Sequence, residues 1–417
     1  MEQGENLLRR NLLYNTIGSL VYFMCQWLIT GLFVKVLSTG SDGLINTGLL
    51  ATAMAVTNVF LTLASYGMRT FQVSDVKCKY SDTTYIASRV ITVAAAILLC
   101  VGFTVIMGYA PEQAKCIYIF LLYKLLEAIT DIFHGCCQKH ERMDIIGISY
   151  GVRGVISIAV FSLMLYFTQN LVLTLAAMTV LCYAFSAYYD IWHTRAFYKP
   201  LQRVQLRSVM LLLAECAPLA IYVFLNTATA SIPKLMLERM LGTPSMAIYS
   251  LVNSPVLILQ VGVTYLFAPF ITVFAHKLGA GDKKGFLKLA AYITLGVFGI
   301  GVAGIAGVLV LGQWGLNLLY GAEIALYHRL LVPMVVCTVF TSLSLFYCML
   351  LTVMRDMRGL IAANVFGIAV SLLISRKLIE GFAMYGTTYA AILALVCQCA
   401  LLCLFGIRKL NKTTDAV

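Results

Sequence analysis

The sequence predicts an all-α polytopic membrane protein with about 12 transmembrane helices in two six-helix lobes. Of its 417 residues, 61% are hydrophobic and 12% are charged, and the mean hydropathy is +0.89. Soluble domains are about half apolar and about a quarter charged. The apolar residues form stretches long enough to cross a hydrocarbon core about 30 Å thick. No polar segment between these stretches is long enough to fold as a soluble domain.

Apolar stretches follow one another along nearly the whole chain. The first begins after Arg9 and Arg10. At about 27 residues it is too long for the apolar region of a cleavable signal peptide, so it is expected to be the first transmembrane helix. The expected spans are residues 11–37, 44–70, 85–109, 114–138, 145–168, 170–192, 208–236, 245–275, 286–312, 328–353, 359–378 and 383–407.

The basic residues between the spans predict the orientation. The net charge of +12 comes from short basic clusters, which are typical of topology signals and do not indicate a nucleic-acid partner. Of the 30 Lys and Arg residues, 21 lie in alternate connections that include both termini, 6 lie in the opposite set, and 3 lie inside spans. This bias places both termini in the cytoplasm.

Similar turns recur at nearly constant spacing and indicate an internal repeat. They lie at offsets of about 204, 200 and 213 residues, and support two six-helix halves of parallel orientation. The matched pairs are Leu37–Ser41 with Leu241–Ser245, Ser81–Thr84 with Gly281–Lys284, and Glu141–Asp144 with Met354–Met357. We therefore expect an N-lobe at residues 1–192, a basic cytoplasmic linker at 193–207 and a C-lobe at 208–417.

The hairpin of spans 4 and 5 carries four charged side chains inside its apolar stretches: Lys124, Glu127, Asp131 and Arg153. A charge at membrane depth costs a few kcal/mol unless it is paired or faces a watery cavity. Asp131 and Arg153 each lie 11 residues from Arg142 in the turn (142 − 131 and 153 − 142), so antiparallel helices would hold them at equal depth. Both an ion-pair network that locks the helices together and a cavity-lining or coupling site fit this pattern.

Span 7 is the second unusual stretch. Glu215 lies about two turns inside its predicted cytoplasmic end, and Pro218 and Pro233 flank a polar run that ends at Lys234. Proline removes helix hydrogen bonds, so the freed backbone groups need partners or water. A kinked helix whose hydroxyls bond to its own carbonyls explains the run equally well.

Three segments resemble a known family of membrane transporters. Leu266–His276, followed by Gly281-Asp282, resembles a segment of the bacterial polysaccharide transporters, the Wzx-type O-antigen flippases. These belong to the multidrug/oligosaccharidyl-lipid/polysaccharide (MOP) exporter superfamily, which also contains the MATE transporters. Tyr66–Phe71 is similar to the glycine-then-arginine stretch of those proteins, and so are Arg142 and Gly151–Gly154. The span count and the repeat extend the resemblance over nearly the whole chain.

The resemblance implies a two-lobed, MATE-like transporter of the bacterial plasma (inner) membrane with an alternately opening cavity. Its substrate would be an oligosaccharide on a polyprenyl diphosphate, moved from the inner to the outer leaflet. Coupling to H⁺ or Na⁺ and cooperation with polysaccharide polymerase machinery are further implications of the resemblance. No cofactor or metal is expected. A diphosphate favours a cationic site, for which the candidates are Arg153, Lys124, Arg69 and Arg89. The candidates for ion coupling are Asp131, Glu127 and Glu215.

Within this picture, Asp131 is expected to neutralise Arg153 in the empty cavity and to release it to the substrate. Topology or contact with lipid headgroups is the competing explanation for Arg69 and Arg89.

Other functions remain as alternatives. A MATE-like exporter of cationic drugs would use an acidic, aromatic cavity, which Glu127, Asp131 and Tyr123 partly provide. Lipid II flippases commonly have more spans. A membrane glycosyltransferase or polysaccharide polymerase would need a large outer loop with catalytic groups, but the longest outer connection, 313–327, has one acidic residue. We therefore expect no enzyme activity.

Overall fold

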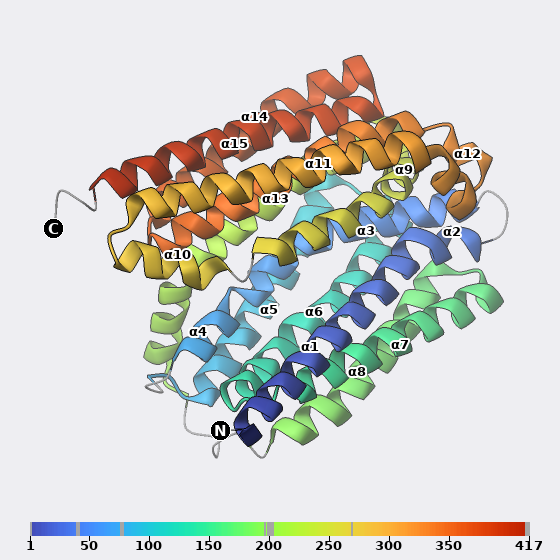
Figure 1. The fold of residues 1–417 in the computed structure, drawn as a ribbon. Coiled ribbons are helices and arrows are strands. Elements are labelled where there is room, and N and C mark those ends of the chain that lie inside the picture. The colour runs from blue at the N-terminus through green and yellow to red at the C-terminus, as the bar shows by residue number, and fades with distance from the viewer. Residues whose placement is uncertain are drawn as a thin grey trace. The chain divides into compact units, whose positions relative to one another are not determined.

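The computed structural model describes residues 2–38, 42–75, 79–195, 197, 204–267 and 270–412. These residues are almost entirely helical, and no β-strand occurs among them. Figure 1 shows the long helices and the short connections that join them. Asp42–Ser65 (α3), for example, consists largely of alanine, leucine, valine and threonine, and most of its residues are buried.

The helices up to Thr194 correspond to the first six expected spans. A π-helical turn, Ile29–Phe33, joins α1 to α2, and α4 continues the path of α3 after a break. The helices are α1 (Glu2–Leu28), α2 (Val34–Val36), α3 (Asp42–Ser65), α4 (Met68–Ser74), α5 (Asp82–Met107), α6 (Pro111–Lys139), α7 (Met143–Thr168) and α8 (Leu171–Thr194).

The remaining helices correspond to the last six expected spans. Spans 7 and 8 correspond to the two helical parts of α9, which meet at a kink at Gly242, where the backbone is non-helical with φ 80° and ψ 173°. A 3₁₀ turn, His328–Leu330, precedes α13. The helices are α9 (Leu206–Phe267), α10 (Phe270–Gly279), α11 (Lys283–Tyr320), α12 (Ala322–Ala325), α13 (Leu331–Val353), α14 (Met357–Phe382) and α15 (Met384–Lys412).

The predicted all-α membrane fold is confirmed. Ten helices of the described chain are long and apolar enough to cross a membrane, and the one at Leu206–Gln260 contains parts of both spans 7 and 8. α6 has 29 residues, long enough to span. It is absent from the ten because Lys124, Glu127 and Asp131 interrupt its apolar stretch. The cytoplasmic location of the termini stays a prediction.

The distribution of side chains is that of a protein surrounded by lipid. Leu98 of α5, Ile106 of α5 and Val310 of α11 are 73%, 78% and 79% exposed. Polar side chains instead occupy the interior, where Arg153, His134 and many hydroxyl groups are fully buried. In a bilayer the apolar surface faces hydrocarbon, whereas polar groups need partners inside the protein.

The chain divides into two compact units, Met1–Phe224 and Leu225–Val417. In the first unit α7 packs on α1 and α8, while α6 packs on α3, α4, α5 and α8. In the second unit α13 packs on α11 and α15, and α14 packs on α15. The linker predicted at 193–207 lies partly outside the described residues, and the lobe boundaries expected there stay a prediction.

The two units contain hairpins with the same turn geometry. Glu141, between α6 and α7, and Arg355, between α13 and α14, both have positive φ (58° and 53°), at an offset of 355 − 141 = 214 residues. In each turn the following residue donates its N–H to a carbonyl five residues earlier, at 2.8 Å from Arg142 and 3.0 Å from Asp356. Such bonds occupy carbonyls that the helix end leaves without donors.

A break between α3 and α4 brings α5 into the interior of the first unit. Tyr66 and Gly67 have φ values of 51° and 64°, which end α3 and free the Ala64 carbonyl. Two side chains of α5, Arg89 and Thr92, donate hydrogen bonds to this carbonyl. The break therefore explains why an arginine of an otherwise lipid-exposed helix points inward.

Candidate functional site: a buried charge network in the first unit

Glu127 of α6 is at the centre of the first group of charged and polar side chains. Its Oε1 accepts hydrogen bonds from Lys124 Nζ and from the hydroxyl of Tyr22, both at 2.7 Å. Lys124 and Glu127 are 13% and 23% exposed, so the pair is mostly shielded from water. Lys124 lies one helical turn from Glu127, as the i, i+3 spacing predicts.

Polar uncharged groups extend this group across three helices. Gln26 of α1 donates hydrogen bonds from Nε2 to the Tyr123 hydroxyl at 2.6 Å and to Ser157 Oγ at 3.1 Å. The hydroxyls of Tyr22 and Tyr123 are 3.3 Å apart. α1, α6 and α7 therefore present hydroxyl and amide groups beside Lys124, and such groups commonly form hydrogen bonds with sugars.

Arg153 of α7 lies between two aromatic rings. Its guanidinium carbon is 5.1 Å from the ring centre of Tyr22 and 5.0 Å from that of Tyr150. Its Nη1 donates a hydrogen bond to Thr130 Oγ1 at 3.1 Å, and the side chain is completely buried. Cation–π contacts of this kind are stronger when water is excluded.

Asp131 forms its ion pairs with arginines other than the one expected. Its two carboxylate oxygens lie 3.4 Å from Arg69 Nη1 and 3.2 Å from Arg89 Nη2. Among the described residues it forms no ion pair with Arg153, so the expected Asp131–Arg153 pair is wrong. Arg153 instead donates a hydrogen bond to Thr130, the residue just before Asp131 in the chain. The depth expected for the partner of Arg153 is therefore correct to within one residue. Because each residue turns an α-helix by 100°, Asp131 points toward α4 and α5 and not toward Arg153.

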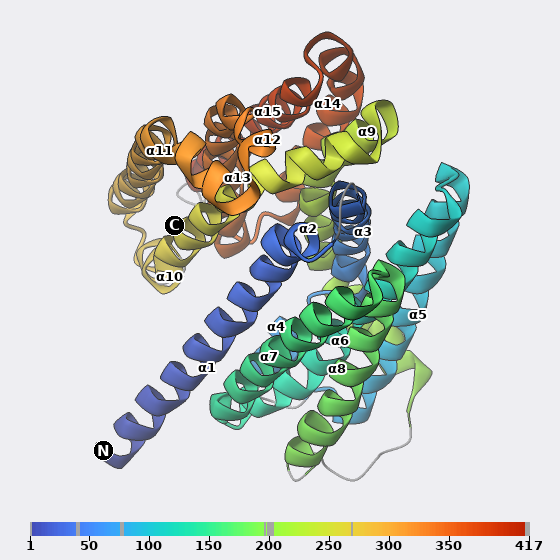
Figure 2. The same ribbon diagram turned by 90° about the vertical axis from the view of Figure 1, so that its right-hand side faces the viewer.

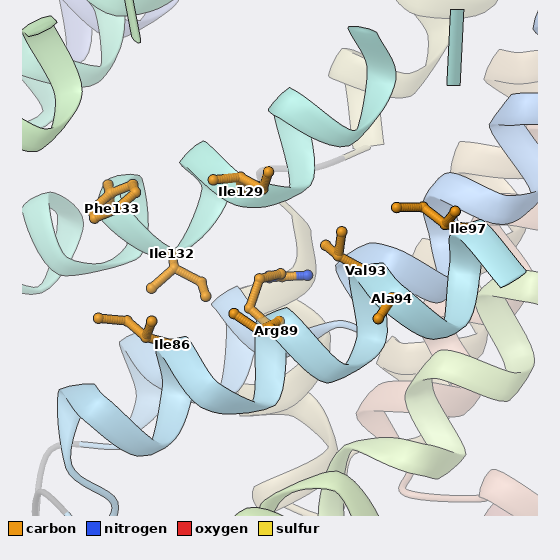
Figure 3. Close-up of a pocket in the computed structure, with 9 residues that line it drawn as sticks. Ile86, Arg89, Val93, Ala94, Ile97, Ile129, Ile132 and Phe133 are labelled. Carbon is orange, nitrogen blue, oxygen red and sulfur yellow. The ribbon is translucent and has the colours of Figure 1, made fainter. Parts of the chain in front are cut away.

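Arg89 joins this network to a groove between α5 and α6. The groove has a volume of about 330 Å³ and is lined by Ile86, Arg89, Val90, Val93, Ala94, Ile97, Ile129, Ile132 and Phe133. In Figure 3 the Arg89 side chain points from α5 into the space between the two helices, flanked by the aliphatic side chains. Arg89 is 3% exposed, so the groove presents hydrocarbon almost exclusively.

Glu215 pairs elsewhere in the first unit. Its carboxylate accepts a hydrogen bond from Lys79, and the side chains of the pair are 39% and 59% exposed. Exposed ion pairs contribute little to stability. Of the seven residues that the sequence singled out, Arg69, Arg89 and Asp131 meet in one cluster and Lys124 and Glu127 in another. Arg153 lies next to both, and Glu215 belongs to neither.

A second buried pair lies outside the residues singled out from the sequence. His134 Nε2 of α6 lies 3.4 Å from Asp190 Oδ1 of α8, and the side chains are 0% and 1% exposed. Both residues lie close to predicted span ends, where a polar group usually reaches water, so their positions in the sequence did not indicate a buried pair. The one indication of burial in the sequence is that each residue falls inside a predicted span, His134 in 114–138 and Asp190 in 170–192.

The second unit has amides where the first has charges. Asn364 of α14 accepts a hydrogen bond from Gln398 Nε2 at 2.8 Å and donates one to the Leu360 carbonyl at 2.8 Å. Ser344, which corresponds to Asp131 at the offset of 213, is fully buried in α13. The charged cluster is therefore a property of the first unit.

Comparison with known proteins identifies the family. Residues 8–274 match the model of the polysaccharide biosynthesis protein family. The chain is similar to the capsular polysaccharide biosynthesis protein CapF of Staphylococcus aureus, with 25% identity over 321 residues, or 75% of this chain and 78% of CapF.

The fold is that of solved MATE transporters. A mutant of the Vibrio cholerae MATE transporter VcmN matches with a TM-score of 0.64 and 12% identity, covering 100% of this chain and 99% of VcmN. An inward-facing multidrug resistance MATE transporter of the MOP superfamily matches with a TM-score of 0.70 and 10% identity, covering 97% of this chain and 99% of the transporter. This chain belongs to the polysaccharide biosynthesis protein family and has the fold of the MATE transporters.

Proposed function

We propose that the protein is a lipid-linked oligosaccharide flippase of the bacterial plasma membrane. It moves polyprenyl-diphosphate-linked repeat units from the inner to the outer leaflet by alternating access. The family match and the relative CapF support a role in polysaccharide export. The observation that carries the proposal is the excess of positive charge inside the first unit.

Four basic side chains share this interior region with two carboxylates. Arg69 and Arg89 together face one acidic group, Asp131. Lys124 is paired with Glu127, and Arg153 has aromatic rings and a hydroxyl around it. A diphosphate brings at least two negative charges, which this cationic region attracts, and arginine and lysine both bind phosphate well.

Exposure suggests a division of roles among the four cations. Arg69 and Lys124 are 27% and 13% exposed, so they are the groups that a diphosphate would contact. Arg89 and Arg153 are buried, and we assign them to holding Asp131 and Tyr22 in position. As the diphosphate approaches, Arg69 exchanges Asp131 for phosphate, while Arg89 continues to neutralise the carboxylate.

Coupling to H⁺ or Na⁺ through Asp131, Glu127 or Glu215 is part of the same proposal, as is delivery of the repeat unit to polymerase machinery outside. The polar side chains of Tyr22 and Gln26, which are both partly exposed, provide the contacts for the first sugar. No catalytic step is required of the protein itself.

Translocation of a polyprenyl-diphosphate oligosaccharide across proteoliposomes tests the proposal. We expect Arg69→Gln and Lys124→Gln to reduce the rate at least about tenfold, which corresponds to about 1.4 kcal/mol. Lys115→Gln is the matched control, because it removes a surface cation of the same unit that pairs with the exposed Glu112, and its rate should equal that of the native chain.

The alternatives predict other results. Glu127 beside Tyr22 and Tyr123 is the feature that would suit a cationic drug. Export of cationic dyes by a native chain that leaves the lipid-linked oligosaccharide in place would overturn the flippase proposal in favour of the multidrug alternative. Elongation of the oligosaccharide in the vesicles would instead indicate a polymerase or glycosyltransferase.

A further inference from the structure

The His134–Asp190 pair lies near one end of the first unit but has no access to water. His134 is five residues from the end of α6 at Lys139, or about 7.5 Å along the helix. Asp190 is four residues from the end of α8 at Thr194. A cluster of Cys137, Ile145 and Ile146, with Met143, Tyr150, Tyr189 and Phe197 around it, packs near these helix ends. Figure 2 shows α6, α7 and α8 running close together in this unit.

The pair can bind one proton without any rearrangement. With Nε2 of His134 directed at the Asp190 carboxylate, the remaining ring nitrogen, Nδ1, is buried and has no hydrogen-bond partner among the described residues. In the neutral histidine this Nδ1 carries a lone pair, and the pair has a net charge of −1. Protonation of Nδ1 gives an imidazolium beside the carboxylate, and the net charge becomes zero.

Neighbouring side chains link the His134–Asp190 pair to Arg153 and Arg69, two of the basic residues of the proposed substrate site. The Tyr150 ring packs edge-on against His134, with ring centres 5.0 Å apart, and the same ring carries Arg153 on its face. The charged and titratable groups around the pair are Arg69 of α4, Cys137 of α6, Tyr150 and Arg153 of α7, and Tyr189 of α8, while the Ser149 hydroxyl of α7 faces the carboxylate.

We propose that His134 and Asp190 form a proton-binding site of this transporter. The site takes up one proton at His134 Nδ1. In its unprotonated state the charge of −1 is stabilised by the field of Arg153 and Arg69.

The site is linked to anion binding, and this part rests on the proposed function. A phosphate bound at Arg69 weakens the cationic field at the His134–Asp190 pair, so the pair retains its proton more strongly. Linkage is reciprocal, so the protonated pair also binds the anion more tightly. The proton and the lipid-linked diphosphate therefore favour each other.

Nitrogen NMR of the native chain in nanodiscs, with ¹⁵N-labelled histidine, tests the site directly. The chain has five histidines, and His134→Gln identifies the signal of His134. We expect this signal to change from the neutral to the protonated form as the pH is lowered in a titration from about pH 8 to about pH 4. Asp190→Asn removes the carboxylate charge and should move the transition to lower pH. His140→Gln is the matched control at the same helix end, because His140 is exposed and stacks on Phe197.

A second arm adds inorganic pyrophosphate as the anion probe. We expect it to increase the proton affinity of His134 roughly 5- to 10-fold, and this increase should disappear in Arg69→Gln.

The outcomes are distinct. A His134 signal that keeps one protonation state over the whole range, with Asp190 intact, overturns the proton site and leaves a structural lock. A titrating His134 that ignores pyrophosphate overturns the linkage. If both effects occur while the native chain fails to move the lipid-linked oligosaccharide, the proton site stands and the flippase proposal fails.

Discussion

At the scale of single residues, the first unit stabilises buried cations in two different ways. Arg69 and Arg89 share the carboxylate of Asp131, whereas Arg153 lies between Tyr22 and Tyr150 and bonds to Thr130. The aromatic arrangement compensates the charge without neutralising it, because a ring offers a quadrupole and no negative charge. The positive field of Arg153 therefore acts on its neighbours, including Glu127 and His134.

Replacing Arg153 with lysine tests this arrangement. The flat guanidinium fits between two rings and a hydroxyl, whereas an ammonium is a compact, strongly hydrated charge. We expect Arg153→Lys to lower the free energy of unfolding by about 2 kcal/mol, measured as thermal unfolding of the purified protein in detergent. Arg376→Lys is the control, since Arg376 is 74% exposed and pairs with Glu380 on the surface. Equal losses in both variants would contradict the argument.

At the scale of helices, glycine allows α1 to approach α7 closely. A Cβ atom on Gly147 would overlap the backbone carbonyl of Tyr14, and one on Gly18 would overlap the carbonyl of Gly147. Small residues permit such approach between membrane helices, where van der Waals contact drives association. The close approach brings Tyr22 and Gln26 of α1 within reach of α6, so the polar cluster depends on these glycines.

Gly147→Ala should therefore separate α1 from α7 and weaken the cluster. We expect a loss of about 1–3 kcal/mol in unfolding free energy, as for other overpacked contacts, together with slower translocation. Gly102→Ala in α5 is the matched control, because its added Cβ meets nothing within 4 Å. The control should be neutral or gain up to about 1 kcal/mol from helix propensity. A stable, active Gly147→Ala would show that the helices have room to move apart.

At the scale of the whole molecule, the repeat combines similar hairpins with different chemistry. Turns with a residue of positive φ recur at Glu141 and Arg355 and at Gln169 and Ala383, each 214 residues apart. The first unit nevertheless contains the ionic network, and the second contains the Asn364–Gln398 contact at the corresponding hairpin. Turn geometry is set by local backbone bonds, whereas interior side chains are free to diverge as long as each polar group finds a partner.

The orientation of the molecule in the membrane is testable with reporter fusions. A reporter that is active only in the cytoplasm should work when fused after Val417 and fail when inserted at Gly321, between α11 and α12. A reporter that is active only outside should give the reverse pattern, because the lysine and arginine bias places the 313–327 connection outside. Activity of the same reporter at both positions would mean that the count of spans between them is wrong.

The sequence alone determined the class of fold, most helix positions and the register of the α6–α7 hairpin. These features depend on hydrophobicity and on rise per residue, which are local quantities. It also singled out Lys124 and Glu127, whose pairing follows from their i, i+3 spacing. The family resemblance placed the chain among proteins of polysaccharide production, and the match to the polysaccharide biosynthesis protein family agrees with it.

Only the tertiary structure decided which charges meet. Asp131 turned out to pair with Arg69 and Arg89, because the rotation of a helix about its axis is set by packing against its neighbours and cannot be read from depth. The meeting of His134 with Asp190 has the same origin. Contacts between distant segments arise from packing of the whole unit, and no local pattern in the sequence encodes them.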